Sequence, residues 1–301
     1  MESGNLVAGF CSTLAHGANP SLSARIKMKI NNGREKYFKT LTRIGKYVDE
    51  TLFKFLEEDK YGGGKKIMYE PLLKRKWGVQ QLRATLFYLS YCAFTGKNPE
   101  EPINDKNLLY LMTSTQLELW AEYSANWIFD NKGEVRENPM NRKKAAVSTK
   151  NFLADAVRMV FKVGPEYVLP ILDTCDGITQ GWTEEFILNI SINPKYLDVP
   201  FQEYMERYRK NKLVLEVGPT MTLPVDLAAL YSKKNKTNKA KKLNKIISEW
   251  GADTQMLNDL GDFSLSAVST DKVSSDQFAD LRNGLITLPI WLMYDGANKK
   301  D

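Results

Sequence analysis

The 301-residue chain is predicted to fold as a single-domain, all-α helical bundle. Apolar residues recur at helical spacing along most of the chain, and few segments show the strict alternation typical of strands. No internal repeat or convincing linker divides the chain, which is long enough to bury a substantial core. We therefore assign 1–33 to an N-terminal extension and 34–301 to one helical domain.

Individual helices are predicted from apolar spacing and from the breakers that follow. The first covers 34–59 and is ended by the glycines that start at Gly62. The second covers 79–95 and stops at Gly96, a typical helix C-terminal residue. The remaining predicted helices cover 105–131, 145–162, 166–176, 182–190, 201–216, 224–232, 240–261 and 276–295.

Bulk composition excludes several classes of protein. With 43% hydrophobic and 26% charged residues, the chain has the composition of a soluble globular protein, and no stretch is long and apolar enough to span a membrane. The first 17 residues make a poor signal peptide, and three distant cysteines indicate neither a disulfide framework nor a zinc site. We therefore expect a cytoplasmic protein.

His16 is the single histidine and lies near the N-terminus in a stretch with glycine and serine. A Ser-His-Asp or Cys-His triad is therefore improbable, and the commonest nitrogen ligand for transition metals is missing. The chemistry that remains open is metal binding through oxygen ligands, or no catalysis.

The net charge of +6 is concentrated in one lysine-rich segment between two apolar segments. Its members are Lys233, Lys234, Lys236, Lys239, Lys241, Lys242 and Lys245. Most such runs are solvated loops. Nucleic acid is not an expected partner, because no aromatic residues alternate with the lysines, so the remaining expectation is at most peripheral contact with an anionic membrane.

Two acidic clusters share the same i, i+1, i+4 spacing. The first is Asp130, Asn131 and Glu134, and the second is Asn258, Asp259 and Asp262. On a helix this spacing gathers three oxygen-bearing side chains on one side. Most acidic triplets of this kind are solvated helix surfaces, but carboxylates at the end of an apolar helix are costly without a compensating cation. We therefore predict Mg²⁺ as the cofactor.

Aromatic residues precede both clusters, including Trp120, Tyr123 and Trp127 before the first and Trp250 before the second. Such residues are most often core. An aromatic cavity closed by metal ions would also stabilise a carbocation, because ring faces attract positive charge.

Several motifs resemble those of the trans-polyprenyl synthetase family, the isoprenyl diphosphate synthases, over roughly 70–295. The residues from Gln255 to Asp262 resemble the family's second aspartate-rich motif, and those from Asp280 to Pro289 resemble its Asp-Leu-x-x-Gly-Lys-x-Thr-Leu-Pro run. The residues from Leu117 to Glu134 resemble the helix that carries the first motif, and Asp155 stands where the family has Gly-Asp.

This resemblance implies an isoprenoid synthase-like bundle around a central apolar cavity, with three Mg²⁺ ions holding an allylic prenyl diphosphate. Asp130, Glu134 and Asp259 would be catalytic, and these residues with Asn131, Asn258 and Asp262 would bind the metal. The implied diphosphate-binding residues are Arg83, Arg142, Lys143, Lys210, Lys212 and Lys272. The family's reaction adds isopentenyl diphosphate to the allylic cation, and the family habit is a homodimer.

Departures from the family pattern affect mainly the site for isopentenyl diphosphate. Val79-Gln80 stand where a Gly-Lys pair precedes Arg83, and Trp120 stands where a histidine is usual. Leu285 replaces the lysine of the last motif, and two amides, Asn131 and Asn258, replace aspartates. An amide keeps a carbonyl oxygen but loses a charge, so weaker metal binding is expected.

Three functions remain open. The first is chain elongation with isopentenyl diphosphate, in which neighbouring basic residues such as Lys74 and Lys143 replace the lost groups. The second uses one prenyl diphosphate only, either as a terpene cyclase or with a non-standard acceptor. The third is a non-catalytic subunit that forms a heterodimer with an active homologue.

Overall fold

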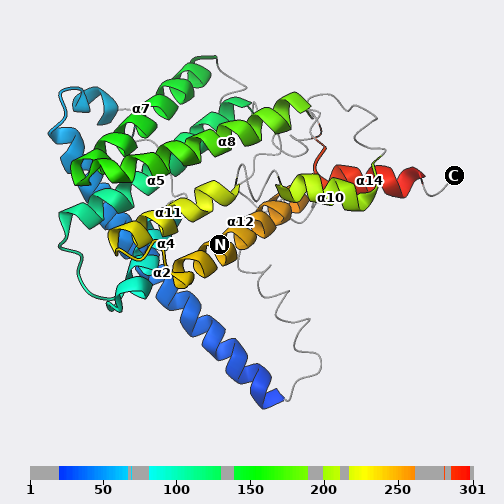
Figure 1. Ribbon diagram of the computed structural model, residues 1–301, viewed down its shortest axis with the longest axis horizontal. Coiled ribbons are helices and arrows are strands. Elements are labelled where there is room, and N and C mark those ends of the chain that lie inside the picture. The colour runs from blue at the N-terminus through cyan, green and yellow to red at the C-terminus, as the bar shows by residue number, and fades with distance from the viewer. Residues whose placement is uncertain are drawn as a thin grey trace.

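The computed structural model describes residues 20–66, 69, 81–129, 139–188, 199–210, 217–261, 281 and 286–298 (Figure 1). Within these ranges the regular structure is helical, and no residue lies in a strand. The all-α prediction is confirmed. The elements are α2 (Pro20–Glu57), α4 (Leu82–Thr95), α5 (Lys106–Phe129), α7 (Pro139–Val163), η1 (Pro165–Tyr167), α8 (Val168–Leu188), α10 (Phe201–Lys210), α11 (Val217–Tyr231), α12 (Asn238–Gly261) and α14 (Leu288–Asn298).

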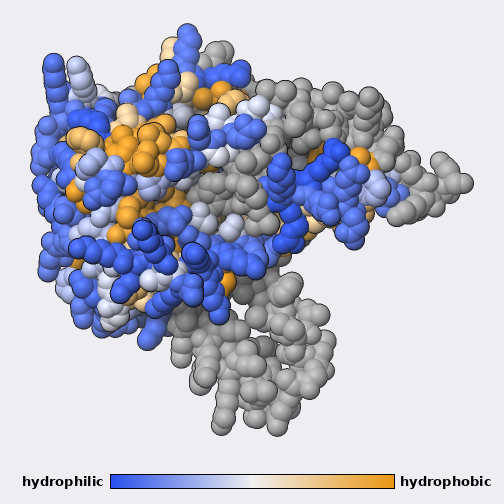
Figure 2. Space-filling view, in the orientation of Figure 1, coloured by the Kyte–Doolittle hydropathy of each residue, from blue (hydrophilic) through white to orange (hydrophobic). Residues whose placement is uncertain are grey.

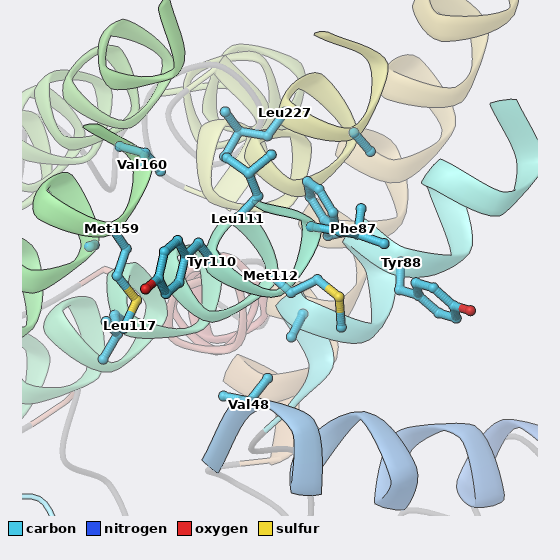
Figure 3. Close-up of a cluster of buried hydrophobic side chains, with 14 of the residues drawn as sticks. Val48, Phe87, Tyr88, Tyr110, Leu111, Met112, Leu117, Met159, Val160 and Leu227 are labelled. Carbon is cyan, nitrogen blue, oxygen red and sulfur yellow. The ribbon is translucent and has the colours of Figure 1, made fainter. Parts of the chain in front are cut away.

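Helix α5 is the central helix of the bundle. Every side chain from Tyr110 to Ala121 is buried, as expected of a helix that is surrounded on all sides. Helices α2, α4, α7 and α11 pack against it. Figure 3 shows side chains of these neighbours, such as Phe87 of α4 and Leu227 of α11, close to Leu111. The core therefore brings together segments that lie far apart in the sequence.

Helix ends agree with the sequence prediction where a local signal is strong. Helix α4 ends as predicted at Gly96, which has a φ of 77° and donates its N–H to the carbonyl of Cys92 at 2.8 Å. Helix α2 begins at Pro20 rather than near residue 34, so one helix crosses the predicted boundary at 33. Proline suits the first helical turn, where its missing N–H costs little. The division into extension and domain stays a prediction.

Several further predicted helix boundaries are wrong. The helices predicted at 166–176 and 182–190 are not separate, because α8 runs unbroken from Val168 to Leu188. Glycine inside a helix costs only about 1 kcal/mol, which packing can offset. Helix α11 begins at Val217 rather than 224 and includes Pro224, in a segment that packs against α4 and α12. Helix α14 begins only at Leu288, and the two residues before it, inside the predicted helix 276–295, are not helical.

None of the described helices is both long and apolar enough to span a membrane.

Candidate functional site

In the sequence, the first acidic cluster directly follows the last residue of α5, and the second spans the last residues of α12. Helix α5 ends at Phe129, directly before Asp130, and α12 ends at Gly261, directly before Asp262. Figure 1 shows both helices ending toward the side of the bundle where α10 and α14 lie. The ring of Phe129 packs against Trp182 of α8, with centroids 5.1 Å apart. The described ends of α5 and α12, which adjoin the two clusters in the sequence, thus lie toward one end of the bundle.

Several predicted site residues lie outside the described residues. They are Asp130, Asn131, Glu134, Lys212, Asp262 and Lys272, and the side chain of Asn258 is likewise not described. Their roles stay predictions.

Asp259 is the predicted magnesium ligand whose side chain the structure describes. It is only 3% exposed, and both its carboxylate oxygens accept hydrogen bonds. Tyr208 of α10 donates its hydroxyl to Oδ2 at 2.7 Å, and Gln255 donates Nε2 to Oδ1 at 3.0 Å. These two donors fix the carboxylate between α10 and α12.

The described residues alone do not fit a magnesium site. Among them, no group of three or more histidine, cysteine, aspartate or glutamate side chains could hold a metal ion. Any magnesium site here would therefore need further ligands from the segments that follow α5 and α12.

Arg83, predicted to bind a diphosphate, points into the bundle interior. It stands in the first turn of α4 and is 6% exposed. Its Nη2 donates to Thr220 Oγ1 at 3.1 Å, and its Nη1 contacts Met221 Sδ, both on α11. In the described part of the chain its Nε has no hydrogen-bond partner. The guanidinium therefore connects α4 to α11.

The other described cations lie on different helices. Arg142 and Lys143 are exposed near the start of α7, and Lys210 is exposed at the end of α10. The start of α7 follows the first acidic cluster in the chain, so Arg142 and Lys143 are the described cations closest in sequence to that cluster. The structure places Arg83 on a separate, buried part of the bundle.

Glu118, which is buried, and Glu122, which is half-buried, form an acidic pair on α5 that the predicted site does not include. Glu118 is 2% exposed, and its Oε2 has no hydrogen-bond partner among the described residues. Burial and the neighbouring Glu122 raise the pKa of Glu118 to about 8, although Arg83 acts in the opposite direction. Glu118 is therefore mainly protonated at neutral pH. The signal in the sequence was an i, i+4 pair of acids inside an apolar helix.

Asp155 is the centre of a buried ion-pair network rather than part of the helix-end clusters. It is fully buried on α7 and accepts hydrogen bonds from Lys65 Nζ at 2.5 Å and Tyr69 Oη at 2.9 Å. Arg158 and Lys65 also pair with Asp59, so the pKa of Asp59 is held well below its usual range. These contacts fix the segment after α2 against α7.

Comparison with known proteins identifies the fold. No protein-family model matches the sequence, and no curated protein matches it in sequence. The heptaprenyl diphosphate synthase of Staphylococcus aureus has a similar structure, with a TM-score of 0.66 and 17% identity over 86% of this chain and 76% of that one. A decaprenyl diphosphate synthase from Rhodobacter capsulatus has a TM-score of 0.66 and 13% identity over 88% of this chain and 77% of that one.

The chain thus has a trans-prenyltransferase-like fold, and the predicted isoprenoid synthase-like bundle is confirmed. Both similar structures are all-α, and the likeness extends over most of the chain. The low identity means that the likeness establishes the fold alone.

Proposed function

We propose that this protein is a magnesium-dependent prenyltransferase. It would ionise an allylic prenyl diphosphate and add isopentenyl diphosphate to make a longer isoprenyl diphosphate. The observation that carries the proposal is the similarity in fold to two polyprenyl diphosphate synthases over 86% and 88% of the chain. The acidic clusters at the ends of α5 and α12 support it. A cytoplasmic homodimer belongs to the same proposal.

The predicted site residues would have three separate roles: metal binding, diphosphate binding and exclusion of water. Asp130, Glu134 and Asp259, with Asn131, Asn258 and Asp262, would hold magnesium, which supplies positive charge for the departing diphosphate when bound. Arg142 and Lys143, exposed near the start of α7, would pair with diphosphate oxygens. The apolar residues of α5 would keep water away from the allylic cation, which water would otherwise quench.

A second candidate function uses one prenyl diphosphate only, as a cyclase or with another acceptor. The position of Arg83 favours it. In the implied elongation reaction Arg83 would bind a diphosphate, but here its guanidinium is buried and engages Thr220 and Met221. Moving it to a diphosphate would break these contacts. A site with fewer available cations suits one diphosphate better than two.

The deciding experiment incubates the purified chain and Mg²⁺ with geranyl, farnesyl or geranylgeranyl diphosphate, with and without labelled isopentenyl diphosphate. Mass spectrometry identifies the products. Longer diphosphates formed only with isopentenyl diphosphate would support elongation. Hydrocarbon or alcohol formed from the allylic substrate alone would support the second function.

Two matched variants test whether any turnover belongs to the proposed site. Asp130→Asn removes a charge from the first cluster, and we expect at least a 100-fold loss of turnover. Asp253→Asn makes the same change on the exposed surface of α12 and should leave turnover unchanged. Absence of turnover with every substrate would contradict both enzymatic functions and favour the non-catalytic subunit.

A further inference from the structure

Helix α12 exposes a row of large apolar side chains. Ile246, Trp250, Leu257 and Leu260 are 51%, 46%, 52% and 43% exposed. Their spacings of four, seven and three residues place them along one side of the helix. The opposite side contains the buried Ala240 and packs on α11. About half of the surface of each side chain in this row is therefore open to solvent.

The lysine-rich segment 233–245 joins the start of this row. Lys239 and Lys242 lie seven and four residues before Ile246, so they extend the same side of α12 toward its N-terminus. All seven lysines of the segment are exposed. Figure 2 shows strongly hydrophilic residues over the region where α12 begins. Basic and apolar side chains thus share one continuous outer face.

The turn that carries the first lysines is ordered by its own hydrogen bonds. The N–H of Lys234 donates to the carbonyl of Ala229 at 2.7 Å, and the Thr237 hydroxyl donates to the carbonyl of Lys234 at 2.7 Å. Thr237 Oγ1 also accepts the N–H of Ala240 at 3.3 Å, which caps the start of α12. The backbone of the turn is therefore held in a fixed position relative to the apolar row.

We propose that this outer face of α12 docks on an anionic lipid membrane. The docking face comprises the four apolar residues Ile246, Trp250, Leu257 and Leu260 and the exposed lysines Lys233, Lys234, Lys236 and Lys242. Helices with a basic part and exposed tryptophan, isoleucine or leucine lie in the plane of the membrane interface. The lysines would contact anionic headgroups, and the tryptophan would insert at headgroup depth. This proposal does not depend on the proposed enzymatic function.

Charge distribution favours a membrane over other partners. Glu249 and Asp253 also lie on this side of α12, but the lysines outnumber them, and Lys245 Nζ lies 4.0 Å from Glu249 Oε1. In a dimer that packs two copies of α12 in parallel through this face, the two lysine segments would lie side by side and repel. Nucleic acid would use the lysines but has no use for exposed isoleucine and leucine.

Vesicle flotation of the full chain tests the proposal. We expect the protein to float with vesicles of phosphatidylcholine and phosphatidylglycerol, and not with phosphatidylcholine alone. Binding should weaken as salt is raised from 50 to 500 mM, because screening acts on exposed charges. These two concentrations are roughly threefold below and roughly threefold above physiological ionic strength.

Matched variants identify the face. The triple variant Lys234→Gln, Lys236→Gln and Lys242→Gln should bind anionic vesicles about 100-fold more weakly, at roughly fivefold for each lysine. Trp250→Ser should weaken binding about tenfold. The control triple Lys54→Gln, Lys144→Gln and Lys150→Gln removes the same charge from exposed sites on α2 and α7 and should bind like the unmodified chain. Circular dichroism confirms that each variant is folded.

Several outcomes would overturn the proposal. One is equal flotation with neutral and anionic vesicles, and another is equal loss in the two triple variants. If Trp250→Ser instead changes the molecular mass by light scattering, the face is an interface between two copies. If single-stranded RNA binds the chain tightly and the first triple variant alone loses it, while vesicles do not bind, the face is a nucleic-acid surface.

Discussion

The hydroxyl of Tyr208 on α10 donates a 2.7 Å hydrogen bond to Oδ2 of Asp259 on α12. Both residues are buried, so this bond joins two helices at the end of the bundle where the second acidic cluster lies. A buried carboxylate that loses a donor keeps the cost of its desolvation. We therefore predict that Tyr208→Phe lowers the free energy of unfolding by about 1–3 kcal/mol. Urea unfolding measures the change.

Tyr61→Phe is the matched control, because Tyr61 is 67% exposed and should lose less than about 0.5 kcal/mol. If Tyr208→Phe is as stable as this control, the hydrogen bond to Asp259 does not hold α10 and α12 together.

Glu118 gives a prediction for the pH dependence of stability. Its pKa is about 8 in the folded protein, against 4.5 for the unperturbed group. Between these values the folded state keeps a proton that the unfolded state loses, so this contribution to stability is complete below about pH 4.5 and is lost as pH rises through about 8. Glu118→Gln should remove a fall on the order of 1 kcal/mol per pH unit in this range.

Denaturant unfolding at several pH values between about 5 and about 8 tests this prediction. Burial also raises the pKa of Asp49 to about 6, with the same sign of effect, so the comparison is between the slopes of the variant and of the unmodified chain. Glu57→Gln, at an exposed position on α2, should leave the slope unchanged. Equal slopes for Glu118→Gln and the unmodified chain would show that Glu118 is charged in the fold.

Sequence reasoning succeeded where one local interaction decides the structure. Gly96 ends α4 because a left-handed residue satisfies the last carbonyls of a helix, and this signal lies within a few residues. The split predicted in α8 was wrong because Gly177 and Gly181 lower only the intrinsic preference for helix. Packing against α11 acts over a longer range and offsets that cost.

The candidate site was less predictable because its contacts join distant segments. Arg83 meets Thr220 across 137 residues, and Lys65 meets Asp155 across 90. Motif spacing does not report such contacts, so it could not show that Arg83 faces α11. Glu118 is different, because an acid in the middle of an apolar helix is a signal that the sequence does contain.

Asp155 offers a test of the buried ion-pair network. Replacing it by alanine leaves Lys65 and the hydroxyl of Tyr69 without this acceptor, and breaking a buried ion pair on one side costs about 3–5 kcal/mol. We predict a loss of that size for Asp155→Ala in urea unfolding. Lys39→Gln breaks the exposed pair between Lys39 and Glu35 and should cost less than about 1 kcal/mol. A similar small cost in both variants would contradict a structural role for the network.

The expected homodimer has a candidate surface where α7 ends and α8 begins. Phe161, Leu169 and Leu172 are 65%, 63% and 44% exposed, and Figure 2 shows an apolar patch over the part of the bundle where Figure 1 places α8. A contiguous apolar patch on a protein surface commonly marks an interface. We predict that light scattering gives the mass of a dimer and that the double variant Phe161→Glu and Leu169→Glu gives the mass of a monomer.

Tyr61→Glu serves as the control for this prediction, since it introduces a charge at an exposed aromatic position outside the patch. Trp250→Ser removes a comparable exposed apolar side chain on α12, and both variants should remain dimers. A dimer that survives the double substitution would place the interface elsewhere. A large apolar surface is stabilised by burial, so it would still be expected to bind a partner if the unmodified chain were a monomer. That partner would be a different protein, as in the heterodimer that the divergent motifs also allow.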